Sequence, residues 1–331
     1  MARQRPQPAR GGRVSAALAA LAAGLIVALG AGAPLIAQLR RLAFGQHVYE
    51  DGPASHQSKS GTPTMGGILF LAAALAAGVI VHTAQAWLLV ALTVACGGIG
   101  LLDDWLIVRY KRALGLRART KLLLIALVAV AFLAYAQTVL APEHRYAILR
   151  WHGGGALDVQ PALWYALSLL AVLATTNAVN LTDGLDGLAA GTMIPALAVS
   201  IAAAAVAGAR GVALVELAMI GACAGFLYYN RHPARIFMGD TGSLALGALL
   251  AGGAILTGTQ LLLPLIGGVF AAEALSVILQ VASYKTTRRR IFRMSPLHHH
   301  FELGGWPETM VTKRFWTAGA ILALAGYVVV R

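Results

Sequence analysis

The feature that most constrains this chain is a series of long apolar runs. Each has about the 17–25 residues that an α-helix needs to cross the hydrocarbon core of a bilayer. With 58% hydrophobic and 12% charged residues, the chain has too much apolar surface for one soluble core. No run alternates in the manner of a barrel strand. The sequence predicts an all-α polytopic membrane protein of about ten transmembrane helices, at 15–37, 65–82, 86–107, 121–140, 161–180, 191–208, 212–229, 243–258, 261–283 and 314–330.

The first run is expected to stay in the mature protein. Four arginines precede it, and AGA at 31–33 resembles a signal-peptidase site. The apolar stretch nevertheless continues past Pro34 to Leu39, long enough to span a membrane. We find no internal repeat, so we expect one integral membrane domain over residues 1–331, with a basic tail at 1–14. Cys96 and Cys223 lie inside apolar runs and are expected to be packing residues.

The net charge of +13 is better explained by membrane topology than by nucleic acid. Ten spans divide the loops into two sets. The set at 38–64, 108–120, 181–190, 230–242 and 284–313, counted with Lys121 and Arg314 at its borders, holds 18 of the 26 Lys and Arg residues. The positive-inside rule places this set in the cytoplasm and both termini outside. The N-terminal arginines alone favour the opposite orientation.

The unusual polar motifs all fall in this cytoplasmic set or at the helix ends that border it. They are KSGTPTMGG (59–67), LLDDW (101–105), NAVNLTDGLDG (177–187), RIFMGDTGS (235–243) and SPLHHHFE (295–302). Ionisable groups inside a membrane are costly and usually functional. Five separate segments that meet at one face of a helical bundle predict an active site at the cytoplasmic face.

Carboxylates dominate these motifs. They contain Asp103, Asp104, Asp183, Asp186 and Asp240, from a total of only 13 acidic residues. Clustered carboxylates repel one another unless a cation joins them, and ligands that are all oxygen favour Mg²⁺ and hence phosphate chemistry. Asn177 and Asn180 precede Asp183 at three-residue intervals, so successive side chains are neighbours on a helix.

The histidine run His298, His299 and His300 is a less convincing metal site. Three consecutive side chains cannot all face one ion from a regular helix or strand, and no HExxH or CxxC accompanies them. We expect them to donate to phosphate or to stack on a base or sugar. The segment at 59–67 is too short for a Walker motif, although its Lys and Thr could bind an anion. The basic stretch 286–294 suits an anionic lipid surface.

Together these motifs resemble the polyprenyl-phosphate N-acetylhexosamine-1-phosphate transferases. The resemblance covers about residues 38–330, and the segment SPLHHHFELGGWPETMVTKRFW (295–316) favours the branch that handles a muramoyl-pentapeptide. It implies transfer of phospho-MurNAc-pentapeptide from UDP-MurNAc-pentapeptide to undecaprenyl phosphate, with lipid I and UMP as products. It also implies a bacterial cytoplasmic membrane enzyme that requires Mg²⁺.

The resemblance assigns roles to individual residues. Asp240 would be the Mg²⁺ ligand, and Asp103 and Asp104 would lie at the reacting phosphates, with Asp103 as candidate base. The residues implied in binding the substrate are Lys59, Thr64, Asn180, Asp183, Asp186, Phe237, Gln280, His298, His299 and His300. Of these, Gln280, His299 and His300 would face the sugar and peptide, and most of the others the nucleoside.

Some questions stay open at this point. The family commonly has Lys three residues after the second Asp of the DD pair, whereas this chain has Ile107. A sister transferase that uses UDP-GlcNAc shares the aspartate motifs. A transporter would be expected to have inverted repeats with acidic residues near the membrane midplane. An intramembrane metalloprotease would need a zinc-binding motif. The sequence decides neither between direct and covalent transfer nor the oligomeric state, for which a homodimer is one option.

Overall fold

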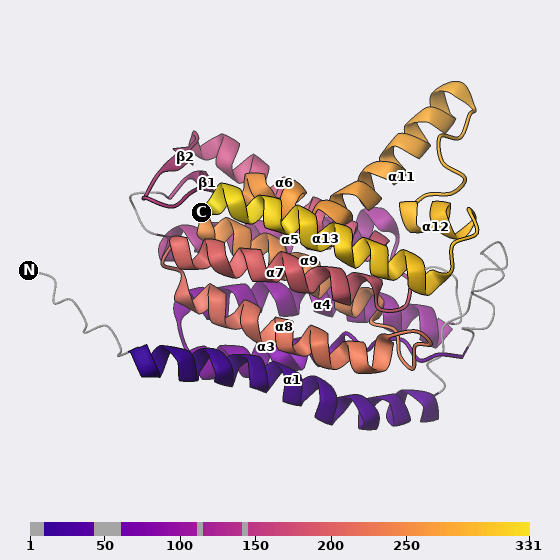
Figure 1. The fold of residues 1–331 in the computed structure, drawn as a ribbon, viewed down its shortest axis with the longest axis horizontal. Coiled ribbons are helices and arrows are strands. Elements are labelled where there is room, and N and C mark those ends of the chain that lie inside the picture. Colours follow the sequence, from indigo (N-terminus) through magenta and orange to yellow (C-terminus); the bar gives the residue numbers. More distant parts are fainter. Residues whose placement is uncertain (1–9, 43–60, 111–114, 141–144) are drawn as a thin grey trace, which may run out of the picture.

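The computed structural model describes residues 10–42, 61–110, 115–140 and 145–331. The described chain is almost entirely helical (Figure 1). Its helices are α1 (Arg10–Arg41), α3 (Ile68–Val81), α4 (Ala84–Tyr110), α5 (Ala118–Val139), α6 (Pro161–Thr182), α7 (Leu188–Val206), α8 (Arg210–Asn230), α9 (Gly239–Thr257), α10 (Leu263–Ile266), α11 (Gly268–Thr287), α12 (Leu297–Glu302) and α13 (Glu308–Val330). A 3-10 turn, η2, covers Gln260–Leu262. A short antiparallel hairpin pairs β1 (Ala147–Arg150) with β2 (Ala156–Asp158).

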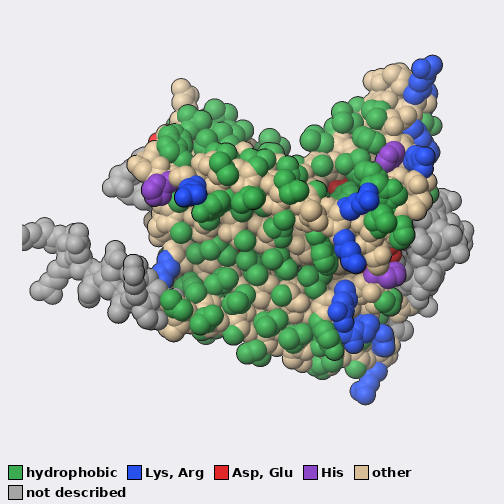
Figure 2. Space-filling view, in the orientation of Figure 1, with side chains coloured by type: hydrophobic (Ala, Val, Ile, Leu, Met, Phe, Trp, Pro, Cys, Tyr) green, Lys and Arg blue, Asp and Glu red, His purple; other side chains and the backbone are tan. Residues whose placement is uncertain are grey.

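The prediction of an all-α polytopic membrane protein is confirmed. Within the described residues, eight helices are long and apolar enough to cross a membrane, or nine if the bent pair formed by Gln260–Ile266 and Gly268–Thr287 counts as one span. Each of the ten predicted apolar runs overlaps one or more helices. Large apolar side chains cover much of the outer surface, as expected of a face that meets lipid (Figure 2).

Two of the predicted spans differ from the prediction. The run at 65–82 forms only α3, whose 14 residues reach about 21 Å and are too short to cross the hydrocarbon core alone. The run at 261–283 is not a continuous helix, because the chain bends by 86° between α10 and α11. Hydropathy detects apolar residues but not the direction of the chain, so it could not show this break.

Helix α9 forms the centre of the bundle. Every residue from Thr241 to Thr257 is buried, whereas Gly239 and Asp240 at its start are partly exposed. Helices α4 and α6 pack along α9, and α7 and α8 lie beside them (Figure 1). The helix is rich in Gly and Ala, which let neighbouring backbones come close. The packing therefore carries Asp240 to one end of the bundle, where α4 ends.

Helix α11 has a different environment. After the bend it projects from the bundle, and α12 lies beneath it beside the start of α13 (Figure 1). Helix α1 begins and α13 ends at the opposite end of the molecule (Figure 1). There the backbone N–H of His152, next to the hairpin, donates to the carbonyl of Val330 at 2.8 Å.

Candidate active site

Two adjacent aspartates on α4 face different neighbours. Successive residues of an α-helix point about 100° apart, so Asp103 and Asp104 cannot share one set of contacts. Both side chains are buried. Helix α4 approaches α9 closely because Gly100 has no side chain, and a Cβ there would lie 2.1 Å from the carbonyl oxygen of Asp240. The sequence prediction that LLDDW and RIFMGDTGS meet is therefore supported by the packing.

Asp104 caps the N-terminus of α9. Its carboxylate accepts hydrogen bonds from the backbone N–H of Asp240 (3.1 Å), the backbone N–H of Thr241 (3.0 Å) and the Thr241 hydroxyl (2.6 Å). The first N–H groups of a helix have no partner within the helix, and a carboxylate at that end is favoured by the helix dipole. Gly239 leaves room for this contact, since a Cβ would lie 2.4 Å from the Asp104 carboxylate. Asp104 thus holds Asp240 in place.

Asp103 instead meets a lysine from α5. Lys121 Nζ lies 3.1 Å from one carboxylate oxygen of Asp103 and also forms an ion pair with Asp240. The other Asp103 oxygen accepts the backbone N–H of Leu116 at 2.6 Å. The ammonium group lies between two carboxylates that would otherwise repel each other. The sequence predicted only a topological role for Lys121, although its position at the edge of an apolar run, beyond Arg117 and Arg119, was an available signal.

Asn180 completes this group from α6. Its amide nitrogen donates to the second Asp240 oxygen at 2.7 Å and to the Ser243 hydroxyl at 2.9 Å. Asn177, one turn earlier, donates to the carbonyl of Leu173 on its own helix and does not join the group. We call the five converging side chains the aspartate cluster, which consists of Asp103, Asp104, Lys121, Asn180 and Asp240.

The motif at 59–67 lies beside the motif at 235–243. The backbone N–H of Phe237 donates to Pro63 (2.9 Å), and the N–H of Gly66 donates to Phe237 (2.8 Å). Thr64 is buried, and its hydroxyl lies close to Gly239 at the start of α9. Phe237 is half-buried. Lys59 lies outside the described residues.

The turn at 183–187 joins α6 to α7. Asp183 ends α6 at its C-cap. The Asp186 carboxylate accepts hydrogen bonds from the backbone N–H of Ala234 (3.0 Å) and contacts His232 Nδ1 (3.1 Å), while Glu308 accepts the N–H of Asp186 (2.7 Å). These partners of Asp186, which are Ala234, His232 and Glu308, are not members of the aspartate cluster. Its predicted role at the nucleoside stays a prediction.

Asp186, His232 and Glu308 also form a group with metal-ligand character. One potential ligand atom from each lies within 4.8 Å of the other two, and no second such trio of His, Cys, Asp and Glu occurs in the described part of the chain. Every ligand atom in it already has a hydrogen-bonding or ionic neighbour. Asp240, the predicted Mg²⁺ ligand, is not a member, so the sequence prediction of its role is untested.

The three histidines each pair with a different group. His298 Nδ1 contacts Glu273 on α11 at 3.1 Å, and His299 Nδ1 contacts Glu302 at 2.8 Å. His300 Nδ1 accepts the backbone N–H of Arg293 at 3.1 Å. The side chains therefore diverge, as expected from consecutive positions on a short helix.

Gln280 supports the segment that follows α11. Its amide oxygen accepts the N–H groups of Ile291 (2.9 Å) and Phe292 (3.0 Å), and its amide nitrogen donates to the Phe292 carbonyl (2.9 Å). Backbone groups of Ile291 and Phe292 therefore satisfy the hydrogen-bonding groups of the Gln280 amide. The sequence alone did not predict that these backbone groups lie beside it. A contact with the sugar, which the resemblance implied, would require these bonds to be exchanged.

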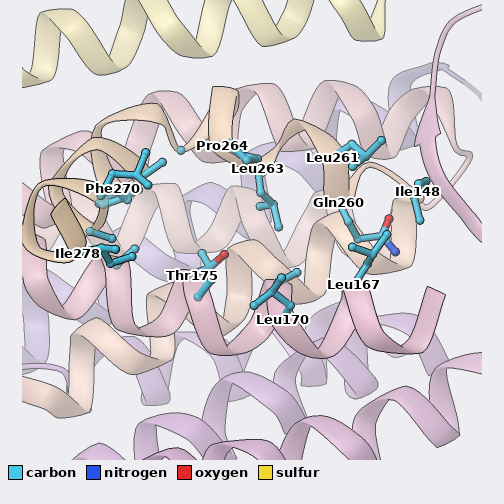
Figure 3. Close-up of a pocket in the computed structure, with 17 residues that line it drawn as sticks. Ile148, Leu167, Leu170, Thr175, Gln260, Leu261, Leu263, Pro264, Phe270 and Ile278 are labelled. Carbon is cyan, nitrogen blue, oxygen red and sulfur yellow. The ribbon is translucent and has the colours of Figure 1, made fainter. Parts of the chain in front are cut away.

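An apolar groove lies against the bend between α10 and α11 (Figure 3). It has a volume of about 360 Å³, and its walls come from α6, η2, α10 and α11. Thr175 and Gln260 are its only residues with polar side chains. The other lining residues are Ile148, Leu167, Leu170, Ala171, Ala174, Ala178, Leu261, Leu263, Pro264, Gly267, Phe270, Ala271, Ala274, Leu275 and Ile278. We call it the α11 groove.

Basic side chains gather at the end of the molecule where α1 ends and α13 begins (Figure 2). Those carried by described elements there include Arg40, Arg41, Arg293, Lys313 and Arg314. Asp103 and Asp104 lie in the last turns of α4, which ends toward the same side (Figure 1). The positive-inside rule assigns such an end to the cytoplasm.

Comparison with known proteins agrees with this arrangement. Residues 86–258 match glycosyl transferase family 4, and residues 59–71 match signature 1 of the phospho-N-acetylmuramoyl-pentapeptide-transferases. The chain is 48% identical over 322 residues to the phospho-N-acetylmuramoyl-pentapeptide-transferase of Desulforudis audaxviator, covering 93% of this chain and 96% of the relative. The transferase of the same name from Heliobacterium modesticaldum is 50% identical over 319 residues, covering 95% and 96%.

A third relative of that name, from Geobacillus kaustophilus, is 47% identical over 295 residues and covers 87% of this chain and 90% of its own length. The family match begins within α4 and ends just after α9, so it contains Asp103, Asp104, Lys121, Asn180 and Asp240. The signature match contains Lys59 and Thr64. This chain therefore belongs to the phospho-N-acetylmuramoyl-pentapeptide-transferases of glycosyl transferase family 4.

Proposed function

We propose that this protein transfers phospho-MurNAc-pentapeptide from its UDP donor to undecaprenyl phosphate, yielding lipid I and UMP, as part of peptidoglycan synthesis. The relatives named for this activity match the chain over almost its whole length. The observation that carries the proposal is the aspartate cluster, in which helices distant in sequence bring three carboxylates, one ammonium and one amide together.

In this reaction a phosphate oxygen of the lipid attacks the β-phosphorus of the UDP donor. A new P–O bond forms, the bond from the β-phosphorus to the bridging oxygen breaks, and UMP leaves with that oxygen. Asp103 would accept a proton from the lipid phosphate, and the contacts of its carboxylate with the Leu116 N–H and the Lys121 ammonium support this role by fixing its position. Lys121 offers positive charge where phosphate oxygens would gather. Asp104 holds the start of α9 and so fixes the position of Asp240.

The cluster suits a divalent cation with oxygen ligands. Asp240 and Asp103 supply carboxylates that already share one ammonium group, and the Ser243 hydroxyl lies beside them. We propose that Asp240, with help from Asp103, would hold Mg²⁺. When bound, Mg²⁺ would neutralise charge on the phosphates of the donor. Asn180 would keep the Asp240 carboxylate turned toward this position.

The α11 groove would receive the prenyl chain. Its lining is almost wholly apolar, as a hydrocarbon ligand requires. We also propose that the aspartate cluster faces the cytoplasm of a bacterial cell and that both termini lie outside. Residues 1–331 would act as one transferase domain. The histidine run and the 183–187 turn would bind the sugar, peptide and nucleoside of the donor.

The test is UMP release by the purified protein with Mg²⁺, undecaprenyl phosphate and either UDP-MurNAc-pentapeptide or UDP-GlcNAc. We expect release only with the muramoyl donor, only in the presence of the lipid, and not after EDTA treatment until Mg²⁺ or Mn²⁺ is restored. UMP release with UDP-GlcNAc but not with UDP-MurNAc-pentapeptide, in the presence of the lipid, would assign the chain to the sister activity. Turnover that survives EDTA would refute the metal assignment.

A further inference from the structure

Glu273 and His298 form a buried pair that links α11 to α12. His298 is 1% exposed and Glu273 is 0% exposed. The Glu273 carboxylate receives three hydrogen bonds, from the backbone N–H of Leu297 (2.5 Å), the backbone N–H of His298 (3.2 Å) and His298 Nδ1 (3.1 Å). Three donors around one buried carboxylate compensate for its loss of water.

This network determines where the imidazole carries its proton. An ionised carboxylate can only accept hydrogen bonds, so Nδ1 of His298 must donate to Glu273. In a neutral imidazole the other nitrogen, Nε2, is then an acceptor. Nε2 is buried and has no hydrogen-bond partner among the described residues. A buried polar atom without a partner requires an explanation.

The unpartnered nitrogen faces the 183–187 turn. A Cβ added to Gly184 would lie 2.3 Å from His298 Nε2, so the ring edge is in direct contact with this glycine. Asp183 and Asp186, two of the residues assigned to donor binding, flank Gly184. His299 and His300 have other partners, Glu302 and Arg293, and do not share this contact.

We propose that Glu273 is a positioning residue for donor recognition. It holds His298 in the tautomer whose Nε2 accepts a hydrogen bond at the 183–187 turn. Gly184 covers Nε2 in this structure, so the turn must shift for an amide N–H or a hydroxyl of the sugar–peptide part of the UDP donor to supply this bond. This inference rests on the proposed function, because it requires that the turn binds that donor. Glu273 itself does not touch the substrate.

The surroundings of Glu273 make this role separable from a general structural one. Phe270, Ala271, Ala274 and Leu275 line the α11 groove, whereas Glu273 points to α12. A loss of order in α11 would therefore disturb the groove and raise the KM for undecaprenyl phosphate. A loss of the correct His298 tautomer would raise the KM for the UDP donor instead.

Glu273→Gln tests the proposal because it keeps the shape of the side chain. With its NH2 group at the position of Oε1, Gln would donate to His298 Nδ1 and move the imidazole proton to Nε2, while its oxygen would keep the bond from the Leu297 N–H and the bond from the His298 N–H would be lost. We expect the donor KM to rise about tenfold or more, the effect of losing one buried hydrogen bond, while the lipid KM changes less than about threefold. In a His298→Ala background, Glu273→Gln should have no further effect on the donor KM.

Glu216→Gln is the matched control. Glu216 is also a fully buried carboxylate on a bundle helix, bonded to the Ser200 hydroxyl at 2.7 Å, but it has no histidine partner. It should leave both KM values unchanged. Gly184→Ala is a second test that leaves Glu273 intact, since its methyl group would displace Nε2 and should also raise the donor KM.

The outcomes separate the two proposals. If the unaltered protein releases no UMP from the muramoyl donor, the proposed function fails. If it is active but Glu273→Gln leaves the donor KM unchanged, or multiplies the effect of His298→Ala, then Glu273 does not act through His298. If Glu273→Gln does not fold, an unchanged donor KM in folded Gly184→Ala would refute the proposal, and an increase would support it.

Discussion

Adjacent residues of this chain have separate physical roles. Asp103 and Asp104 are neighbours in LLDDW, yet Asp103 meets the Lys121 ammonium whereas Asp104 binds three donors at the start of α9. The 100° angle between successive helical positions accounts for the difference. Asp104 therefore orients Asp240, and we propose charge and proton chemistry for Asp103.

Asp240→Asn should abolish most turnover while leaving the protein folded. The change keeps the size of the side chain but removes the charge that pairs with Lys121 and would hold Mg²⁺. We expect turnover to fall about a thousandfold, since several kcal/mol of transition-state stabilisation would be lost.

His299→Ala should instead raise the donor KM at least as much as it lowers kcat. Steady-state kinetics with each substrate varied would check both, and near-normal turnover of Asp240→Asn would contradict the role given to Asp240.

Lys121→Gln should also impair turnover strongly. Without the ammonium group, the carboxylates of Asp103 and Asp240 lose the ion-pair partner that they share, and the phosphates lose a positive partner. A decrease of about a hundredfold in kcat is expected, comparable to the loss of one electrostatic contact in an active site. Arg119→Gln, at an exposed position two residues earlier on α5, is the matched control and should be silent. Equal effects of the two changes would mean that Lys121 serves only topology.

At the level of elements, α9 and α11 differ in how they are packed. The fully buried α9 fixes Asp240 at its N-terminus, because a helix enclosed on all sides has little freedom to move. Helix α11 leaves the bundle at an 86° bend and offers one side to the α11 groove and the other to α12. The groove proposed for the lipid and the histidine run proposed for the donor therefore meet different faces of one helix.

Ala271→Phe should obstruct the α11 groove and weaken use of the lipid acceptor. The new ring would fill part of a cavity of about 360 Å³ whose other walls are already packed. We expect the KM for undecaprenyl phosphate to rise severalfold with little change in the KM for the UDP donor. Leu279→Phe, an exposed position on α11 that does not line the groove, is the control. A change confined to the donor KM would show that the groove does not hold the acceptor.

The charge distribution of the whole molecule predicts its orientation in the membrane. Basic side chains concentrate at the end where α4 carries Asp103 and Asp104, whereas the hairpin and the last residue of α13 lie at the other end (Figures 1 and 2). Positive charge is retained on the cytoplasmic side during insertion. The two proposed substrates, a UDP donor and a lipid phosphate, would then meet at that surface.

Single-cysteine labelling tests this orientation. Arg290→Cys after α11 and His152→Cys beside the hairpin are both exposed, whereas the native Cys96 and Cys223 are buried and should not react. In intact cells an impermeant thiol reagent should label position 152 and spare position 290, and inside-out vesicles should show the reverse. Labelling of both positions from one side would overturn the ten-span topology.

The sequence by itself determined the class of the protein and the residues worth examining. Apolar runs of membrane-spanning length have few structural alternatives, because a buried backbone in lipid must satisfy its own hydrogen bonds. Carboxylates within such runs are costly enough to mark a site, and this reasoning pointed to Asp103, Asp104 and Asp240.

The tertiary structure alone decided how those residues combine. Lys121 meets Asp103 across 18 residues of sequence and Asp240 across 119, and Glu273 meets His298 across 25. Hydropathy and motifs describe neighbours along the chain, but such contacts depend on how closely helices pack, which Gly100 and Gly239 permit. The bend before α11 is likewise invisible to composition, since both halves are equally apolar. The direction in which an apolar helix runs is set by what it packs against.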